Sequence, residues 1–526
     1  QHAAAPYRQT LSLLFGAAVL LLLIACANVS SLILARSQAR LREFAVRASL
    51  GASSSRIIGQ VVLEGLALGL AGAGAGLLFS AWALSAASSI IPATLDWRVA
   101  SFAVVIAVLS SLLFSIYPAW RVSRVDLTGA LRTAGQKGMV GGGSGWFRRS
   151  LAAGQVALSL LMLCGSLMLL REMSRLLKVD MGMDPSNVLV SYTHIPADKL
   201  EDHLAATRVF SDLLSELRAS PQVDSAAAIM GMPTGKYNSN GGYMIAGQPV
   251  PKDLNKLPQA GFRINTPGFF STLRIPIKKG RDFAENDSFD HPFVAIVNET
   301  LAIRAFPNTD PIGKQILCGL DSPKPMTIVG VVADVRHDGA ASENNAELYM
   351  PYQQHPYHAN ELQIAIRAHG DPKPLAALVS DLANKRNPDI AVNSLTLQSM
   401  LDNNILMTRF RTQLITAMAI MALILASAGL YGVLAYLVSQ RLSEFGLRVA
   451  LGAARSDIVR LVWREAAMIL GIGFSIGMVM IVGVGCRDAQ SMLVAVVVLA
   501  TAALAASIIP SWGAAKADPL TVLRSE

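Results

Sequence analysis

The sequence predicts an α-helical membrane protein of about seven transmembrane helices, with one large α+β domain outside the membrane. Only 15% of its 526 residues are charged, whereas soluble domains have about 25%. Two candidate spans, 57–80 and 461–485, carry charge near one end (Glu64; Arg464 and Glu465). Five runs have no Asp, Glu, Lys or Arg, and each reaches the roughly 20 helical residues that cross a ~30 Å hydrocarbon core. These runs are 11–35, 99–120, 150–170, 412–438 and 489–511.

The distribution of basic residues predicts the orientation. Four segments next to the spans hold 17 Lys and Arg against 6 Asp and Glu, while the rest of the chain is close to neutral. Because positive charge is retained on the cytoplasmic side, we expect these segments, and with them the C-terminus, to be cytoplasmic. They are 36–56, 121–149, 439–460 and 512–526. The net charge of +9 then reflects a multi-pass protein of the plasma (inner) membrane, in contact with lipid, and no nucleic-acid partner is expected.

The segment 171–411 is predicted to be the extracytoplasmic α+β domain. Short β-rich runs such as 293–297 and 327–333 alternate with helical stretches such as 201–219 and 373–386. Turn sequences rich in Asn, Asp and Pro separate these runs. At about 240 residues, the segment is long enough for one domain with two lobes.

An internal repeat relates the two ends of the chain. Residues 43–52 read EFAVRASLGA, and residues 444–453, 401 positions later, read EFGLRVALGA. A closing sequence, at 117–132 and again at 509–524, ends each copy. The offset of 401 relates three further pairs: Ile57 and Ile458, Val61 and Val462, Glu64 and Glu465.

The repeat divides the chain into five predicted parts. Only the second copy is preceded by a helix and an external domain, so we expect the natural chain to be longer, with one helix and one external domain upstream of Gln1. The parts are a three-helix block at 1–133, a Gly-rich cytoplasmic linker at 134–149, a helix at 150–170, the external domain at 171–411 and a second three-helix block at 412–526.

The repeated sequence predicts a cationic helical elbow on the cytoplasmic face of each block. An amphipathic helix leaves the membrane, and Gly51 or Gly452 stands where a helix end favours a left-handed residue. The alternative is a loop whose positive charge only sets topology. Because both copies keep the pattern, we favour docking of a partner. The candidate residues are Phe44, Arg47, Leu50 and Gly51, and Phe445, Arg448, Leu451 and Gly452.

Other features favour structural interpretations. The closing sequence predicts a short helix with Asp518 at its N-cap and Pro519 at its first helical position, which we expect to support the elbow. Glu64 and Glu465 could relay protons in the membrane, but both lie within about two turns of the predicted surface, where water or an arginine can reach them. A disulfide between Cys318 and Cys486 is not favoured by their contexts.

No catalytic, cofactor or metal site is predicted. The chain has no G-x-x-x-x-G-K-[ST], H-E-x-x-H or G-x-S-x-G sequence, so neither nucleotide binding nor catalysis by those motifs is expected. His355 and His358 lack a third ligand nearby, which favours a surface loop over a metal pair. We therefore expect a protein that is not an enzyme.

Taken together, these motifs resemble the MacB/FtsX-type permeases of ATP-binding-cassette systems, and in particular their duplicated orphan-permease group. Segments 266–283, 294–316, 327–339 and 347–354 are similar to the MacB-like periplasmic core domain, and the two blocks are similar to FtsX-like transmembrane blocks. The resemblance implies an ATP-binding-cassette ATPase supplied in trans, docking on the elbows, and an outer or periplasmic partner protein. It also implies export or efflux by mechanotransmission, in which ATP-driven helix movements displace the external domains.

Two other functions remain open. The same movements could make the protein a membrane scaffold or signal transmitter that regulates an extracytoplasmic partner such as a hydrolase. A membrane enzyme would need a nucleophile, base or metal constellation that the sequence does not display. The substrate and the identity of the ATPase do not follow from the sequence.

Overall fold

The computed structural model describes residues 5–40, 43–44, 46–47, 50, 52–86, 96–123, 142–194, 204–234, 239–249, 251–253, 256–386, 390–441, 444–445, 448 and 454–515. The chain separates into two compact units. A helical unit comprises Gln1–Glu172 and Phe410–Glu526, and an α+β unit comprises Met173–Arg409.

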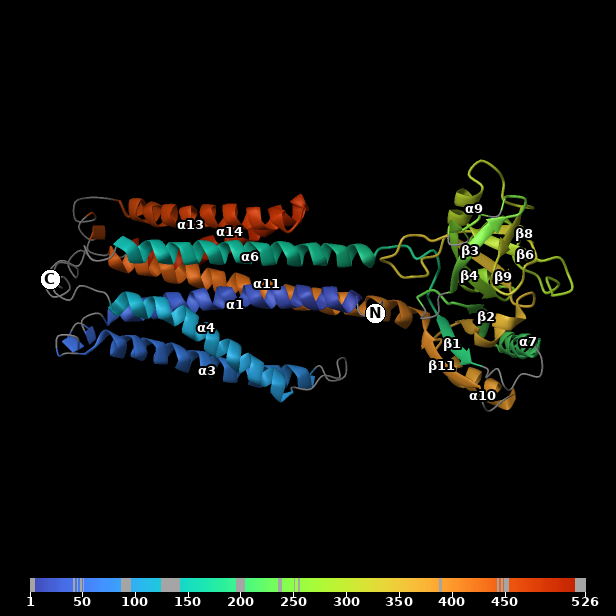
Figure 1. Ribbon diagram of the computed structural model, residues 1–526, viewed down its shortest axis with the longest axis horizontal. Helices are drawn as coiled ribbons and strands as arrows, with labels where there is room; N and C mark the ends of the chain where they lie inside the picture. The colour runs from blue at the N-terminus through green and yellow to red at the C-terminus, as the bar shows by residue number, and fades with distance from the viewer. Residues whose placement is uncertain are drawn as a thin grey trace. The chain divides into compact units, whose positions relative to one another are not determined.

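Seven helices of the described chain are long and apolar enough to cross a membrane, as the sequence predicts. Large apolar side chains such as Leu63, Phe79 and Trp82 are exposed on them, which is typical of helices that lie in lipid. The helices are α1 (Ala5–Ala39), α3 (Ser54–Ala86), α4 (Trp97–Ser123), α6 (Gly142–Leu176), α11 (Leu397–Gln440), α13 (Arg455–Gly483) and α14 (Ala489–Ala515) (Figure 1).

Helix α6 is the most buried of the seven spans. Its Ser159 Oγ donates a hydrogen bond of 3.1 Å to the carbonyl of Ala422 on α11. On its other side, α13 approaches closely because Gly473 and Gly477 have no side chain; a Cβ at Gly473 would lie 2.6 Å from Cγ1 of Val156. Small residues and interhelical hydrogen bonds are the usual means by which helices pack within a membrane.

The α+β unit is built on one eleven-stranded sheet. Its order is β11-β1-β10-β2-β4-β3-β7-β8-β6-β9, with β5 paired to β8. Because β9 also pairs in parallel with β4, the strands β4, β3, β7, β8, β6 and β9 form a closed ring. The strands β11, β1, β10 and β2 form an open extension, and β5 lies beside β8 outside this path. The strands are β1 (Val188–His194), β2 (Val223–Met230), β3 (Ser239–Ile245), β4 (Gln259–Asn265), β5 (Ile277–Gly280), β6 (Val294–Asn298), β7 (Gln315–Cys318), β8 (Met326–Val332), β9 (Glu347–Pro351), β10 (Gln363–Ala368) and β11 (Ala391–Thr396).

Helices cover both faces of the open extension. Phe210 and Leu213 of α7 pack with Ala226 and Ala228 of β2 on one face, while the alternate residue Ala227 packs with α8 on the other, as the period of two in a strand requires. The predicted strands at 293–297 and 327–333 are confirmed as β6 and β8, and the predicted helices as α7 and α10. The helices are α7 (Ala205–Arg218), α8 (Phe269–Thr272), α9 (Glu299–Ala305) and α10 (Leu375–Arg386), with a 3₁₀ helix, η5, at Pro356–Glu361.

The last strand of the α+β unit passes directly into a membrane helix. β11 ends at Thr396 and α11 begins at Leu397, with no residue between them. Leu397 and Met400 are buried in the same core cluster as Val188 and Phe270. The first turn of α11 is therefore part of the folded α+β unit, and α11 continues without a break to Gln440.

A buried ion pair joins β4 to β9. Arg263 Nε of β4 is 3.1 Å from Glu347 Oε2 of β9, and both side chains are almost fully enclosed. Burial raises the pKa of Glu347 to about 7, against the opposing charge of Arg263. Nearby, His337 Nε2 is hydrogen-bonded to the Tyr349 hydroxyl at 3.1 Å, and burial holds the pKa of His337 well below its usual value.

Candidate functional site

The first elbow is anchored by a buried aromatic side chain. Phe44 is only 4% exposed, and it packs with Ile33 of α1 and with Ile57 and Val61 of α3. Burial of a phenylalanine side chain stabilises a fold by roughly 1.5–3 kcal/mol. The segment that leaves α1 is thus fixed against the start of α3.

Ion pairs connect the same elements around this anchor. Arg40 Nε lies 2.7 Å from Glu43 Oε2, and its Nη1 lies 2.7 Å from Glu64 Oε1 on α3. Arg47 Nη2 lies 2.6 Å from Glu43 Oε1. The hydrogen bond from Arg40 holds the pKa of Glu43 below its usual value, so this carboxylate stays charged at neutral pH.

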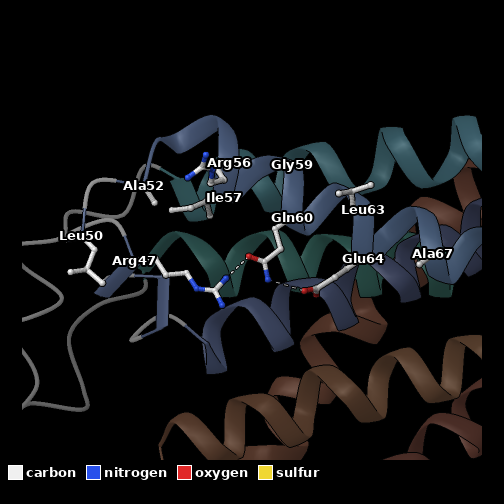
Figure 2. Close-up of a pocket in the computed structure, with 10 residues that line it drawn as sticks. All are labelled: Arg47, Leu50, Ala52, Arg56, Ile57, Gly59, Gln60, Leu63, Glu64 and Ala67. Carbon is white, nitrogen blue, oxygen red and sulfur yellow. Dashed lines mark hydrogen bonds between the residues drawn. The ribbon is translucent and has the colours of Figure 1, made fainter.

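An open groove of about 980 Å³ lies beside these ion pairs (Figure 2). Leu50, 82% exposed, stands at one end of it. The Gln60 amide joins two of the charged residues, since it accepts a hydrogen bond of 2.6 Å from Arg47 and donates one of 3.3 Å to Glu64. The lining residues are Arg47, Leu50, Ala52, Arg56, Ile57, Gly59, Gln60, Leu63, Glu64 and Ala67.

The second elbow repeats the anchor and one of the ion pairs. Phe445 is 2% exposed and belongs to the same core cluster as Leu434, Ile458 and Val462, which are the repeat equivalents of the residues around Phe44. Arg448 Nη2 lies 2.6 Å from Glu444 Oε1, as Arg47 does from Glu43. Two sequences far apart in the chain therefore build the same local structure.

The two elbows differ in how their membrane glutamate is paired. Glu64 is paired with Arg40 of its own block, whereas Glu465 accepts a hydrogen bond of 2.9 Å from Arg149 on α6. The neighbouring Arg148 stacks over the ring of Tyr436, with its guanidinium carbon 3.7 Å from the ring centroid. Each glutamate thus has an arginine partner, which supports the structural interpretation over a proton relay.

The predicted docking residues do not all face outward. Arg47 and Leu50 line the groove, and Arg448 is half-exposed. Phe44 and Phe445, in contrast, are anchors that a partner does not reach. Gly51, Leu451 and Gly452 lie outside the described residues, as do Asp518, Pro519 and most of the closing sequences.

Sequence reasoning missed the wall of the groove that α3 provides. Arg56, Gln60 and Leu63 all line it, and their spacing of four and then three residues places them on one face of a helix. That spacing, directly after the repeated motif, was a signal that could have found them.

The prediction for His355 was wrong. It is not on a surface loop: its side chain is buried, and its Nδ1 lies 2.5 Å from Asp321 Oδ1. The ring also packs edge-on against Phe293. Among the described residues, no group of His, Cys, Asp and Glu is arranged to hold a metal ion, and Cys318 and Cys486 are both thiols.

Two family models match the chain. The MacB-like periplasmic core domain matches residues 151–384, and the FtsX-like permease C-terminal domain matches residues 15–127 and 416–487. The two FtsX-like matches begin at positions that differ by 401, which is the offset of the internal repeat.

Curated relatives and a solved structure are similar to parts of the chain. A "Macrolide export ATP-binding/permease protein MacB" of Hahella chejuensis is 27% identical over 281 residues, which are 49% of this chain and 42% of the relative. A "Probable export ATP-binding/permease protein" of Pseudomonas fluorescens is 26% identical over 224 residues, 41% of this chain and 34% of the relative. The periplasmic region of MacB from Actinobacillus actinomycetemcomitans matches with 13% identity and a TM-score of 0.30, covering 42% of this chain and 94% of that structure. The chain spans less than half the length of these curated relatives.

Proposed function

The chain belongs to the MacB/FtsX-type permeases of ATP-binding-cassette systems, and from this premise we propose that it couples a separate ATPase to movement of its extracytoplasmic domain. It is a multi-pass membrane protein, and the α+β unit is its extracytoplasmic part. The proposal assigns the elbows and the C-terminus to the cytoplasm, because the segments around them carry most of the positive charge.

The observation that carries the proposal is the structural repetition of the elbow. In both blocks a buried phenylalanine fixes the segment, and an arginine paired to a glutamate is left half-exposed beside it. A loop that only sets topology needs positive charge but not an anchored conformation. A fixed pattern of charge and apolar surface, as at Arg47 and Leu50, is what docking to another protein requires.

The connection between β11 and α11 supports the coupling step. Because the first turn of α11 is buried in the α+β core, a shift of this helix cannot occur without displacing the strands to which Leu397 and Met400 are packed. A flexible linker would absorb such a shift. The proposed output is therefore a movement of the extracytoplasmic domain, which an outer or periplasmic partner protein would receive.

Co-purification from the native membrane tests the docking proposal. We expect the full chain to retain an ATP-binding-cassette ATPase, and the double variant Arg47→Glu with Arg448→Glu to lose at least nine tenths of it. Arg304→Glu is the matched control: it reverses the charge of an exposed arginine in the last turn of α9 and should retain the ATPase fully.

The outcome also separates the two candidate functions. Equal recovery of the ATPase with the elbow variant and the control would exclude docking on the elbows. Recovery of an extracytoplasmic enzyme without any ATPase would favour the scaffold or signal transmitter instead. A loss restricted to the elbow variant would leave the export substrate as the next question.

A further inference from the structure

Equivalent helices of the two blocks meet in the membrane. The offset of 401 makes α11 the counterpart of α1, and both lie beside α6 (Figure 1). Asn28 Nδ2 of α1 donates a hydrogen bond of 2.8 Å to the carbonyl of Leu425 on α11. Gln155 Nε2 of α6 in turn donates one of 3.2 Å to Asn28 Oδ1. A polar group that lies in a hydrocarbon region is stable only with such partners.

The residue equivalent to Asn28 in the second block is Gly429, and it lies at the same contact. A Cβ at Gly429 would lie 2.5 Å from Asn28 Oδ1 and 2.0 Å from Gln155 Oε1. These distances are far shorter than the van der Waals contact of about 3.5–4.0 Å. The two amide side chains therefore occupy the space that any side chain at position 429 would need.

The contact is complementary only because the two equivalent residues differ. If α1 packed in this way against α1 of a second chain, two asparagine side chains would compete for the space that a glycine leaves free. If α11 packed against a second α11, two glycines would face each other. Gln155, which is only 2% exposed, would then lose its contact with Asn28.

We propose that Asn28 and Gly429 form a specificity lock that pairs the two membrane blocks within one chain and disfavours pairing of identical blocks from two chains. The surface is the α1 face that carries Asn28, and its partner is the α11 face that carries Gly429. Specificity of this kind comes from making the alternative pairings unfavourable as well as from the favoured contact. The lock does not depend on whether an ATPase docks on the elbows.

Cysteine cross-linking in the full chain tests the pairing. The reporters are Ile24→Cys and Leu425→Cys, equivalent positions one turn before Asn28 and Gly429, in a background in which the four native cysteines are replaced. A short bis-maleimide joins the reporters, and a protease site inserted at 134–141, before α6 begins at Gly142, separates the halves. Fragments that stay joined after cleavage report pairing within a chain, and a band of twice the chain mass reports pairing between chains.

Three changes are compared in this reporter background. Gly429→Asn should lower the yield of the cross-link within a chain at least fivefold. The swap of Asn28→Gly with Gly429→Asn should restore at least half of that yield, since it exchanges the large and the small partner. Gly432→Ala is the control, because a Cβ at Gly432 meets nothing within 4 Å, and it should cross-link like the parent.

The proposal is overturned by any of three results. The first is a parent chain whose cross-links mainly join the same reporter position of two chains, position 24 to 24 or position 425 to 425. The second is a Gly429→Asn variant that cross-links as well as the parent. The third is a swap that stays as low as Gly429→Asn, which would show that size complementarity does not pair the blocks. Elution of each variant as a single species on size exclusion in detergent shows that a loss is not caused by unfolding.

Discussion

Arg149 and Glu465 are separated by 315 residues in the chain, yet their side chains form a partly buried ion pair of 2.9 Å. The pair joins α6 to α13 next to the second elbow. A charged hydrogen bond of this kind is worth about 1.5–3 kcal/mol, and a buried group left without its partner costs about as much. The contact is therefore a measurable part of the stability of the helical unit.

We expect Arg149→Gln to lower the free energy of unfolding by about 1–3 kcal/mol, because it removes the positive charge beside Glu465. Thermal unfolding in detergent, followed by tryptophan fluorescence, measures the loss. Combining Arg149→Gln with Glu465→Gln should recover part of it, since no isolated charge is then left. A double variant whose loss is the sum of the two single losses would contradict the assignment of this pair.

The pH dependence of the α+β unit should include a contribution from Glu347. Its folded pKa of about 7 lies above the ordinary value of 4.5. Between these two values the unfolded chain releases a proton that the folded chain keeps, so this group lowers the free energy of unfolding as the pH rises. The full effect, reached above pH 7, is on the order of 3 kcal/mol.

Glu347→Gln should remove this contribution, because the amide has no proton to release. Hydrogen exchange of peptides covering β9 between pH 5 and 8, corrected for the intrinsic exchange rate, measures it. As the pH rises, the β9 peptides should lose more protection in the parent than in the variant. His337 contributes in the opposite direction below its ordinary pKa, and it does so equally in both proteins. Parallel profiles for the two proteins would show that Glu347 has an ordinary pKa.

The close approach of α13 to α6 should make Gly473 intolerant of a side chain. A methyl group there would lie within 3 Å of Val156 and of the carbonyl of Ala153. Gly473→Ala should therefore lower the free energy of unfolding by about 1–3 kcal/mol, the usual cost of overpacking. Gly471→Ala, on the same helix and with nothing within 4 Å, should leave the stability unchanged or raise it. Equal melting temperatures for the two variants would argue against this packing.

The proposed topology predicts which side of the membrane labels each of two exposed positions. In a chain without its native cysteines, Glu285→Cys should react with an impermeant maleimide added from outside. Ser55→Cys, beside the first elbow, should react only after the membrane is made permeable. Labelling of Ser55→Cys in sealed cells would reverse the orientation that the basic segments predict.

The membrane helices could be predicted closely because their signal is local. The predicted run 489–511 is the helix Ala489–Ala515, and the predicted 11–35 lies within Ala5–Ala39. The prediction for 412–438 was too short, since α11 begins at Leu397. The residues between carry charges such as Asp402, Arg409 and Arg411. Only the first turn, with Leu397 and Met400, packs in the α+β core. A search for uncharged runs does not detect a helix that continues through charged residues.

The site was less predictable because it depends on contacts between distant residues. The motif identified Arg47 and Leu50, but only the packing with Ile33 and Val61 makes Phe44 an anchor instead of a contact surface. Likewise, nothing local to His355 indicates Asp321 as its partner, so its burial could not be foreseen. The complementarity of Asn28 and Gly429 was present in the aligned repeats, but it has meaning only once α1 and α11 are known to touch.

The direct passage from β11 into α11 also has a mechanical consequence. A helix of 44 residues is about 66 Å long, and it can act as a stiff lever. A tilt of about 10° around one end would displace the other by roughly 11 Å for a rod of that length. A displacement of that size equals the diameter of a helix with its side chains, about 10–12 Å.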